Sequence, residues 1–182
     1  MPNEPLLTVD GLSVAFGAGK SAITVVDDVS FAVRRGETLA LVGESGSGKT
    51  LTGKSLLGIL PKGAFISGGS AILNDGGDQA DLLGMSNAEL RKVRGGRVSM
   101  IFQEPMSSLS SLHTVGNQVM EALTLHANCR GKEAKARCLE TFENVGFPDP
   151  ERAFNAYPFE LSGGLRQRAM IAMAMVCRPS LK

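Results

Sequence analysis

The alternation of apolar and polar positions predicts an antiparallel β-sheet in the first part of the chain. Short apolar runs alternate with polar residues before residue 40, and a period of two is typical of strands with one buried face. The strands predicted there, with Asp and Gly turns between them, are Leu6–Val9, Leu12–Phe16, Ile23–Val26 and Val29–Val33. Phe65–Ser67 and Ser70–Leu73 continue the pattern, and Gly68–Gly69 and Asn74–Gly77 are predicted to be turns.

A strand, a glycine-rich loop and a helix are predicted in succession between residues 37 and 61. The run Glu37–Val42 contains enough branched apolar residues to form a buried strand. The segment Thr50–Leu60 has the pattern of a helix, which Pro61 ends. The loop between the two is therefore placed at the amino end of a helix.

Beyond residue 85 the pattern becomes mostly helical. Ser86 and Glu89 form a capping box that starts a short helix, and the apolar run Val98–Phe102 is predicted to be a strand. From Val115 onward apolar residues recur at helical spacing, and a last helix is predicted over Leu165–Cys177. The second part of the chain is therefore predicted to be a helical subdomain.

Composition and charge exclude several classes of protein. The chain has 182 residues, enough for one domain with a sizeable core, and a net charge of +1. This near-neutral balance argues against nucleic acid or an anionic membrane surface as the main partner. The amino end lacks the order of a signal peptide, and the longest wholly apolar run, Ala169–Cys177, has nine residues, too few to span a bilayer. A cytosolic protein is expected.

Cysteines and histidines do not predict a metal site. The three cysteines form no CxxC pair, which fits a reducing compartment and thiols that are buried or half-buried. His113 and His126 have no metal-ligand spacing and are expected to be surface or packing residues.

The loop after the predicted strand fits the phosphate-binding pattern GxxxxGK[ST]. Its residues are Gly43, Glu44, Ser45, Gly46, Ser47, Gly48, Lys49 and Thr50. The glycines let successive N–H groups point inward at phosphate oxygens. Lys49 would add a positive charge near the β- and γ-phosphates, and the Thr50 hydroxyl would ligate Mg²⁺. The motif predicts that a nucleoside triphosphate binds here; the alternative is a Gly/Ser-rich turn that matches by chance.

A second candidate site precedes the last helix, in the run Leu161–Arg168. Ser162 can cap this helix, and Gly163 and Gly164 leave its N–H groups accessible to an anion. Arg166 and Arg168 lie in the first turn, where positive charge is unfavourable, so an anionic partner or a particular contact should compensate. The alternative is an ordinary cap with solvated arginines.

A third candidate is the end of the predicted strand at Ile101–Pro105. Gln103 can hold a water molecule or an Mg²⁺-bound oxygen without cancelling the charge of the metal. Taken alone it is as consistent with a turn residue.

Together these motifs resemble the ATP-binding-cassette (ABC) ATPase family over nearly the whole chain. The phosphate loop at 43–50, the Gln-Glu-Pro end at 101–105 and the sequence LSGG at 161–164 occur in the family's order. The runs MIFQEPMSSLSSLHTVGNQV (Met100–Val119) and YPFELSGGLRQRAMIAMAM (Tyr157–Met175) are similar to the ATPase subunits of dipeptide, oligopeptide and nickel importers.

The resemblance implies roles for residues of all three motifs. Gly43–Thr50 would be the Walker A loop, and Gln103 the Q-loop residue that touches Mg²⁺, with Thr50, and senses the membrane subunits. Lys49 and Gln103 would take part in catalysis. The family signature Leu161–Gly164 would complete the ATP site of the opposite subunit through Ser162, Gly163 and Gly164. Phe16 would stack on adenine; the alternative is a core phenylalanine.

Two departures from the family pattern are visible. Leu165 stands where the signature usually has Gln. The sequence stops at Lys182, where the family begins the strand that carries the Walker B aspartate, followed by the catalytic glutamate and the switch histidine. The segment 1–182 is therefore expected to hydrolyse ATP poorly, and apolar surface is expected to be uncovered around Leu39–Val42 and Val98–Phe102.

The fold expected is α/β, a P-loop NTPase core like that of the ABC ATPases, without the carboxyl-terminal part of the core. A single domain over 1–182 would comprise an antiparallel β-subdomain with the Walker A part of the core at 5–105, and a helical subdomain with the signature at 106–177.

The function expected is that of an ATP- and Mg²⁺-binding subunit that couples ATP hydrolysis to the import of peptides or similar solutes. It would lie at the cytoplasmic face of the inner membrane, where Glu104–Thr114 would meet the membrane subunits. A second identical or related ATPase subunit, and indirectly a solute-binding protein, would be partners. Two alternatives remain: a non-catalytic nucleotide-binding remnant, and a soluble ABC ATPase that acts on nucleic acid or ribosomes.

Overall fold

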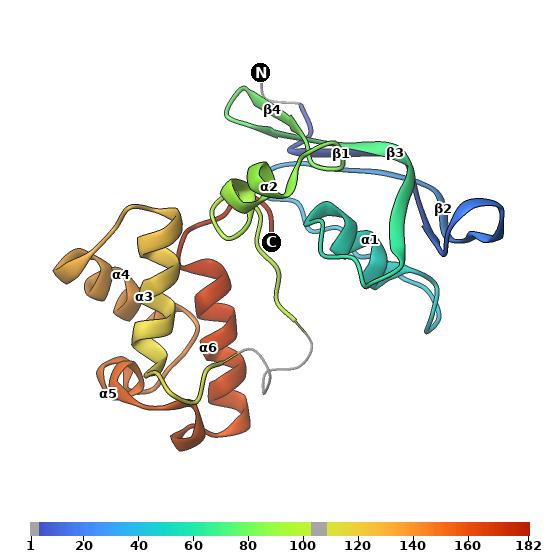
Figure 1. Cartoon of the computed structure of the whole chain (residues 1–182). Helices are drawn as coiled ribbons and strands as arrows, with labels where there is room; N and C mark the ends of the chain where they lie inside the picture. The colour runs from blue at the N-terminus through green and yellow to red at the C-terminus, as the bar shows by residue number, and fades with distance from the viewer. Residues whose placement is uncertain (1–3, 103–108) are drawn as a thin grey trace. The chain divides into compact units, whose positions relative to one another are not determined.

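The computed structural model describes residues 4–102 and 109–182, which form two compact units. The first unit is Met1–Arg91 and the second is Lys92–Lys182 (Figure 1). The short helix α2, Asn87–Val93, crosses the boundary between them, and its predicted capping box is confirmed, because the Ser86 N–H donates to Glu89 Oε2 at 2.8 Å.

The first unit is built on a four-stranded antiparallel sheet with the strand order β2-β1-β3-β4 (Figure 1). Its strands are β1 (Leu7–Phe16), β2 (Ile23–Val33), β3 (Ala64–Asp75) and β4 (Asp78–Asp81), with a 3-10 turn, η1, at Gly19–Ser21. Apolar side chains of the central strand β1 alternate into the core, and Leu12 and Val14 are fully buried. The antiparallel sheet is confirmed, but β4 was not predicted, since Asp78–Asp81 carries little apolar signal.

The strands of this sheet are longer than the sequence predicted, because three predicted turns lie within strands. These are the turn between Val9 and Leu12 in β1, the turn between Val26 and Val29 in β2, and Gly68–Gly69 in β3. Gly68–Gly69 lies inside β3, where Gly68 pairs with Ser13 of β1. Gly69 has a φ of +93°, and a Cβ at this position would lie 2.6 Å from backbone atoms of Gly11. Glycine is needed here so that two backbones can approach closely beside the register shift of β1.

The segment Glu37–Val42 forms no strand, so this prediction was wrong. A strand requires a neighbour that satisfies its backbone N–H and C=O groups, and the described sheet pairs none of its strands with this segment. Its apolar side chains are exposed, and Val42 has 92% of its surface accessible. The helix after the loop, α1, begins at Lys49 and ends at Leu56, four residues before the predicted end.

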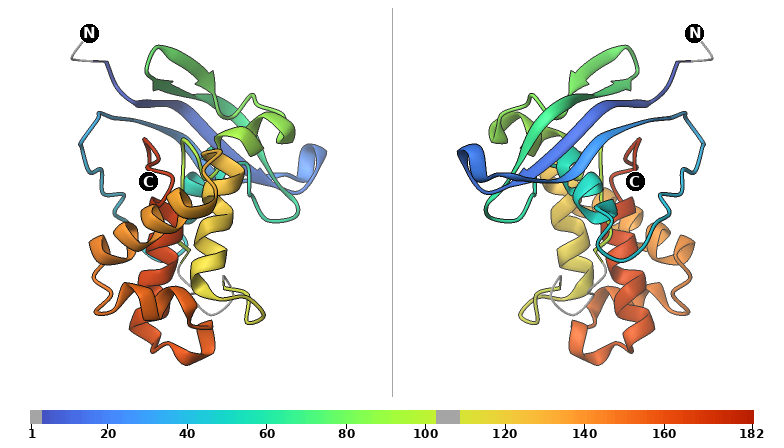
Figure 2. Two further views of the ribbon diagram at one scale, coloured as in Figure 1. Left: turned by 90° about the vertical axis from the view of Figure 1, so that its left-hand side faces the viewer. Right: turned by 90° about the vertical axis from the view of Figure 1, so that its right-hand side faces the viewer.

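The second unit is a helical subdomain (Figure 2). Its helices pack around one apolar core. The helices are α3 (Val115–His126), α4 (Gly131–Asn144), α5 (Pro150–Asn155) and α6 (Gly163–Met175), with a 3-10 turn, η3, at Pro158–Glu160. Fully buried residues at helical spacing, such as Val119 and Leu123 on α3, fill the core around Phe142. The predicted helical pattern from Val115 onward is confirmed.

The predicted strand Val98–Phe102 is reduced to single bridges. Val98 pairs with Arg94 and with Leu181, and Ile101 and Phe102 are nearly half exposed. The exposure of apolar side chains that was expected is therefore confirmed for Leu39–Val42, Ile101 and Phe102, whereas Val98 is buried; neither segment is a strand.

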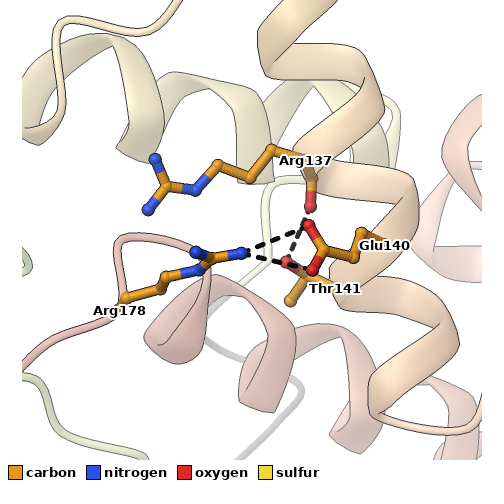
Figure 3. A network of polar contacts seen from close by, with 4 residues as sticks. All are labelled: Arg137, Glu140, Thr141 and Arg178. Carbon is orange, nitrogen blue, oxygen red and sulfur yellow. Dashed lines mark hydrogen bonds and ion pairs between the residues drawn. The ribbon is translucent and has the colours of Figure 1, made fainter.

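The segment after α6 is tied to α4 by an ion pair on the surface (Figure 3). Nη2 of Arg178 lies 3.2 Å from Oε1 and 3.3 Å from Oε2 of Glu140. Arg178 has a φ of +54°, which is uncommon for a residue with a side chain. Because both side chains are exposed, the pair contributes little, roughly 0 to 1 kcal/mol.

Candidate functional site

The phosphate-loop residues turn the chain into the amino end of α1. Gly46 and Gly48 have φ values of +86° and +88°, a region in which glycine is favoured. Gly48 is the N-cap of α1 and offers no side-chain oxygen to the first N–H groups of the helix. These N–H groups and the positive end of the helix dipole therefore remain available to an anion.

The Lys49 ammonium folds back into the loop and donates to three of its oxygen atoms. Its Nζ lies 2.7 Å from the Gly43 carbonyl oxygen, 2.7 Å from the Glu44 carbonyl oxygen and 3.1 Å from the Ser47 hydroxyl. An ammonium has three N–H donors, so these oxygens match its capacity. The motif predicts Ser47 to be one of the nucleotide-binding residues of the loop, and the structure shows in addition that its hydroxyl accepts from Lys49.

Gly43 is required by the packing of the loop itself. Its backbone has no positive φ, but a Cβ at this position would lie 2.7 Å from Ser47 Oγ and 3.8 Å from Lys49 Nζ. A side chain here would displace the hydroxyl that accepts from Lys49.

The loop packs against the β1–β2 hairpin, which carries Phe16. A Cβ on Gly48 would lie 2.8 Å from Val26 Cγ2 and 3.2 Å from the Val25 carbonyl oxygen. Phe16 is the last residue of β1 and pairs with Ile23, two residues before Val25 on β2. The fold therefore brings half-buried Phe16 and the phosphate loop to the same end of the hairpin.

A magnesium ion at this loop would rely on few protein ligands. Thr50 is exposed on the first turn of α1, and its hydroxyl is a hard oxygen ligand suited to Mg²⁺. Gln103, the other predicted ligand, lies outside the described residues, as do Glu104, Pro105 and the start of the predicted helical subdomain at Met106. Among the described residues no group of three His, Cys, Asp or Glu side chains could hold a metal ion.

The signature segment forms the amino end of α6 in the second unit. Ser162 is the N-cap, and its Oγ accepts from the Leu165 N–H at 3.3 Å, which confirms the predicted cap. A Cβ on Gly163 or Gly164 would meet no atom of the described residues within 4 Å, and neither glycine has a positive φ. These glycines differ from those of the phosphate loop, because the described residues do not require them.

The two arginines after the signature are bonded to backbone carbonyl groups. Arg166 Nε donates to the carbonyl oxygens of Pro158 and Leu161, and Arg168 Nη1 donates to that of Gly146. The particular contact that the sequence suggested is therefore present for both arginines.

Cys129 and Cys138 are buried and Cys177 is half-buried, as expected, and none carries a sign of reactivity. Burial raises the pKa of Cys138 to about 12 and also raises the pKa values of Cys129 and Cys177. High pKa values keep thiols protonated and weakly nucleophilic.

Comparison with known proteins identifies relatives of the chain. A family model described as "ABC transporter" matches residues 26–182. The chain is 51% identical over 98% of its length to the peptidoglycan transport ATP-binding protein YejF of Agrobacterium fabrum, and covers 32% of that protein. It is 46% identical over 97% of its length to the oligopeptide transport ATP-binding protein AppD of Bacillus subtilis, covering 53%. The chain therefore spans about a third to a half of these curated relatives.

The fold also matches solved structures. The ATP-binding cassette MJ0796, solved as a dimer in a post-hydrolysis state bound to ADP and Pi, superposes with a TM-score of 0.78 at 24% identity, over 95% of this chain and 70% of that one. This likeness shows the fold of an ATP-binding cassette. Within the described residues no helix is both long and apolar enough to cross a membrane.

Proposed function

The chain belongs to the ABC transporter family, and from this membership we propose that it is the ATP-binding part of an importer that couples ATP hydrolysis to the uptake of peptides or similar solutes. The names of its relatives, which include oligopeptide and peptidoglycan transport proteins, support the class of solute. The proposal places the protein at the cytoplasmic face of the inner membrane.

The observation that carries the proposal is the position of Lys49 inside its loop. The ammonium lies at the amino end of α1, where phosphate oxygens would meet loop N–H groups and the helix dipole. A bound triphosphate would offer oxygens in place of the Gly43, Glu44 and Ser47 acceptors. Thr50 and Gln103 would hold Mg²⁺, which would neutralise charge on the phosphates.

Phe16 is proposed to hold the adenine ring. The phosphate loop packs against Val25 and Val26 of the β1–β2 hairpin, in which Phe16 is the last residue of the first strand. A nucleotide whose phosphates lie in the loop would therefore have its base near that hairpin. An aromatic face there offers stacking, which adds about 0.5–1.5 kcal/mol beyond area burial for aromatic pairs in proteins.

The signature segment is proposed to contact the nucleotide of a second ATPase subunit. The described residues leave open space beside Gly163 and Gly164, so contacts within the chain do not explain why both positions are glycine. A group from outside the chain that approaches this backbone closely would explain them. The N-terminal N–H groups of α6, with Ser162, would bind the γ-phosphate there. ATP would lie between two identical or related chains.

The membrane subunits of the importer are the proposed partners of Glu104–Thr114. This segment follows Gln103 and contains residues outside the described part of the chain, so the assignment rests on the family resemblance. A separate solute-binding protein would deliver the solute to those membrane subunits.

Calorimetry with ATP and a cellular uptake assay test the proposal. The chain should bind ATP, and Lys49→Ala should abolish the uptake of a labelled peptide by cells that depend on the protein. Uptake that persists with Lys49→Ala would contradict an importer role. If the protein bound nucleic acid in a salt-dependent way, and Lys49→Ala had no effect on peptide uptake, the alternative of a soluble ABC ATPase would be favoured.

Turnover is proposed to need more than residues 1–182. Phosphoryl transfer to water requires an acidic metal ligand and a group that positions the water, which the family resemblance places after Lys182. The segment 1–182 by itself should therefore bind Mg-ATP and release little phosphate. Lys49-dependent release equal to that of a protein extended past Lys182 would contradict this.

A further inference from the structure

The Arg166 side chain links the first turn of α6 to the turn that precedes the signature. Its Nε lies 2.7 Å from the Pro158 carbonyl oxygen and 3.0 Å from the Leu161 carbonyl oxygen, and its Nη2 lies 3.5 Å from that of Phe159. All three acceptors belong to η3 or to the residue after it. One guanidinium thus holds the carbonyl end of the 3-10 turn.

The same residue also closes the first turn of α6 through its backbone. The Arg166 N–H donates to the Ser162 carbonyl oxygen at 2.9 Å. Arg166 therefore contacts the chain on both sides of the signature glycines. Its backbone N–H bonds to Ser162 within α6, and its guanidinium bonds to the carbonyl groups of η3 and Leu161, which precede Ser162.

The chemistry of this contact requires arginine. A carbonyl oxygen has two lone pairs, so the Pro158 oxygen, which already accepts from the Leu161 N–H within the turn, can accept a second hydrogen bond from Arg166. The planar guanidinium presents several donors in a fixed arrangement. A lysine ammonium could reach one of these oxygens but would not hold all three in one geometry. The contact also directs positive charge toward carbonyl oxygens, which offsets its unfavourable position near a helix amino end.

We propose that Arg166 is a positioning residue that fixes the Ser162–Gly164 segment for its contact with a second subunit's nucleotide. This inference rests on the proposed function, because that contact is part of it. Arg166 does not touch the nucleotide; it holds the turn at Pro158–Leu161 and the helix start at a fixed spacing, so that the α6 N–H groups are already aligned when a phosphate arrives.

Arg168 provides a matched control on the same helix. It donates to the Gly146 carbonyl oxygen, which lies after α4 and not in the signature turn. Arg168→Lys therefore makes the same replacement of a guanidinium by an ammonium, but at a residue that bonds to Gly146 and not to the turn before the signature.

Hydrogen exchange and ATP-driven dimerisation together test the inference. The reporter amides are those of Glu160, Leu161 and Leu165, which donate to Tyr157, Pro158 and Ser162. In Arg166→Lys they should exchange about tenfold faster or more, as expected for the loss of charge-assisted hydrogen bonds. Arg168→Lys should leave them within about twofold of the parent. Arg166→Gln, with a thermal melt for every variant, shows whether loss of the guanidinium or general unfolding is responsible.

The functional measurement is sedimentation with Mg²⁺ and a non-hydrolysable ATP analogue, for the protein extended past Lys182. The dimer dissociation constant should rise about tenfold in Arg166→Lys, which corresponds to about 1.4 kcal/mol, while nucleotide affinity of the monomer stays unchanged. Unchanged exchange, or faster exchange with unchanged dimerisation, would overturn the role of Arg166 alone. A parent protein that does not dimerise would instead contradict the proposed two-chain site, and the inference with it.

Discussion

The Lys49 ammonium donates to the Gly43 carbonyl oxygen across 2.7 Å, so one bond joins the seventh residue of the phosphate loop to the first. The loop is thereby closed by the residue that would meet the ligand. A phosphate that draws Lys49 toward itself must compete with this bond, and the affinity for ATP reflects the difference between the two states.

Replacement of Lys49 by alanine is expected to weaken ATP binding much more than Arg91→Ala. Only Lys49 lies in the loop, whereas Arg91 is an exposed residue of α2. Loss of charge-assisted hydrogen bonds to phosphate should raise the dissociation constant at least about tenfold. Calorimetry on variants with intact melting transitions checks this, and equal constants for both variants would remove the phosphate-loop assignment.

The sequence predicted the elements whose signal is local. The capping box at Ser86 and Glu89, the Ser162 cap and the helices from Val115 onward are all present, because each depends on residues a few positions apart. Glu37–Val42 and Val98–Phe102 were predicted wrongly as strands. A strand depends on a pairing neighbour far along the chain, which an apolar run cannot reveal.

The candidate site shows the same division. Motif spacing was enough to select Gly43–Thr50 and Leu161–Gly164 as sites, whose ligand roles stay predictions. It did not reveal that Ser47 accepts from Lys49, or that Arg166 holds the turn before the signature. Both contacts depend on where a side chain folds back onto the backbone, which spacing alone does not determine.

Gly116→Ala is expected to destabilise the helical subdomain. A Cβ there would lie 2.4 Å from the Phe154 ring and 2.6 Å from its carbonyl oxygen, so α3 and α5 would have to separate. Overpacking of this kind costs about 1–3 kcal/mol. The control is Gly96→Ala, where the nearest contact of the new Cβ is an ordinary 3.6 Å. Chemical denaturation measures both, and equal stabilities would contradict the tight contact.

Cys138 is expected to resist alkylation well above neutral pH. Burial raises its pKa from 9.0 to about 12, so the neutral thiol is the form that the fold stabilises. The contribution of this buried neutral thiol to the free energy of unfolding is complete below pH 9 and is lost as the pH rises from 9 toward 12. Mass spectrometry after iodoacetamide treatment at pH 8 should show Cys138 modified only in denaturant. Rapid modification in the native state would show that the subdomain opens readily.

Gly164→Asp is expected to block ATP-driven dimerisation without harming the fold or the monomer's affinity for ATP. A side chain at this position meets no atom of the described residues within 4 Å, and a carboxylate at a helix amino end is favoured by the helix dipole. The same carboxylate would repel the γ-phosphate of the nucleotide that the opposite subunit presents. Gly164→Ala separates the effect of the charge from the effect of the added side-chain volume. It should melt at the parent's temperature or higher, because alanine favours a helix by up to about 1 kcal/mol over glycine. It should still impair dimerisation if the partner's nucleotide occupies the space beside Gly164. Sedimentation of the protein extended past Lys182, with Mg²⁺ and a non-hydrolysable ATP analogue, measures the association. If Gly164→Asp dimerises as well as the parent, the signature segment does not contact nucleotide across two chains.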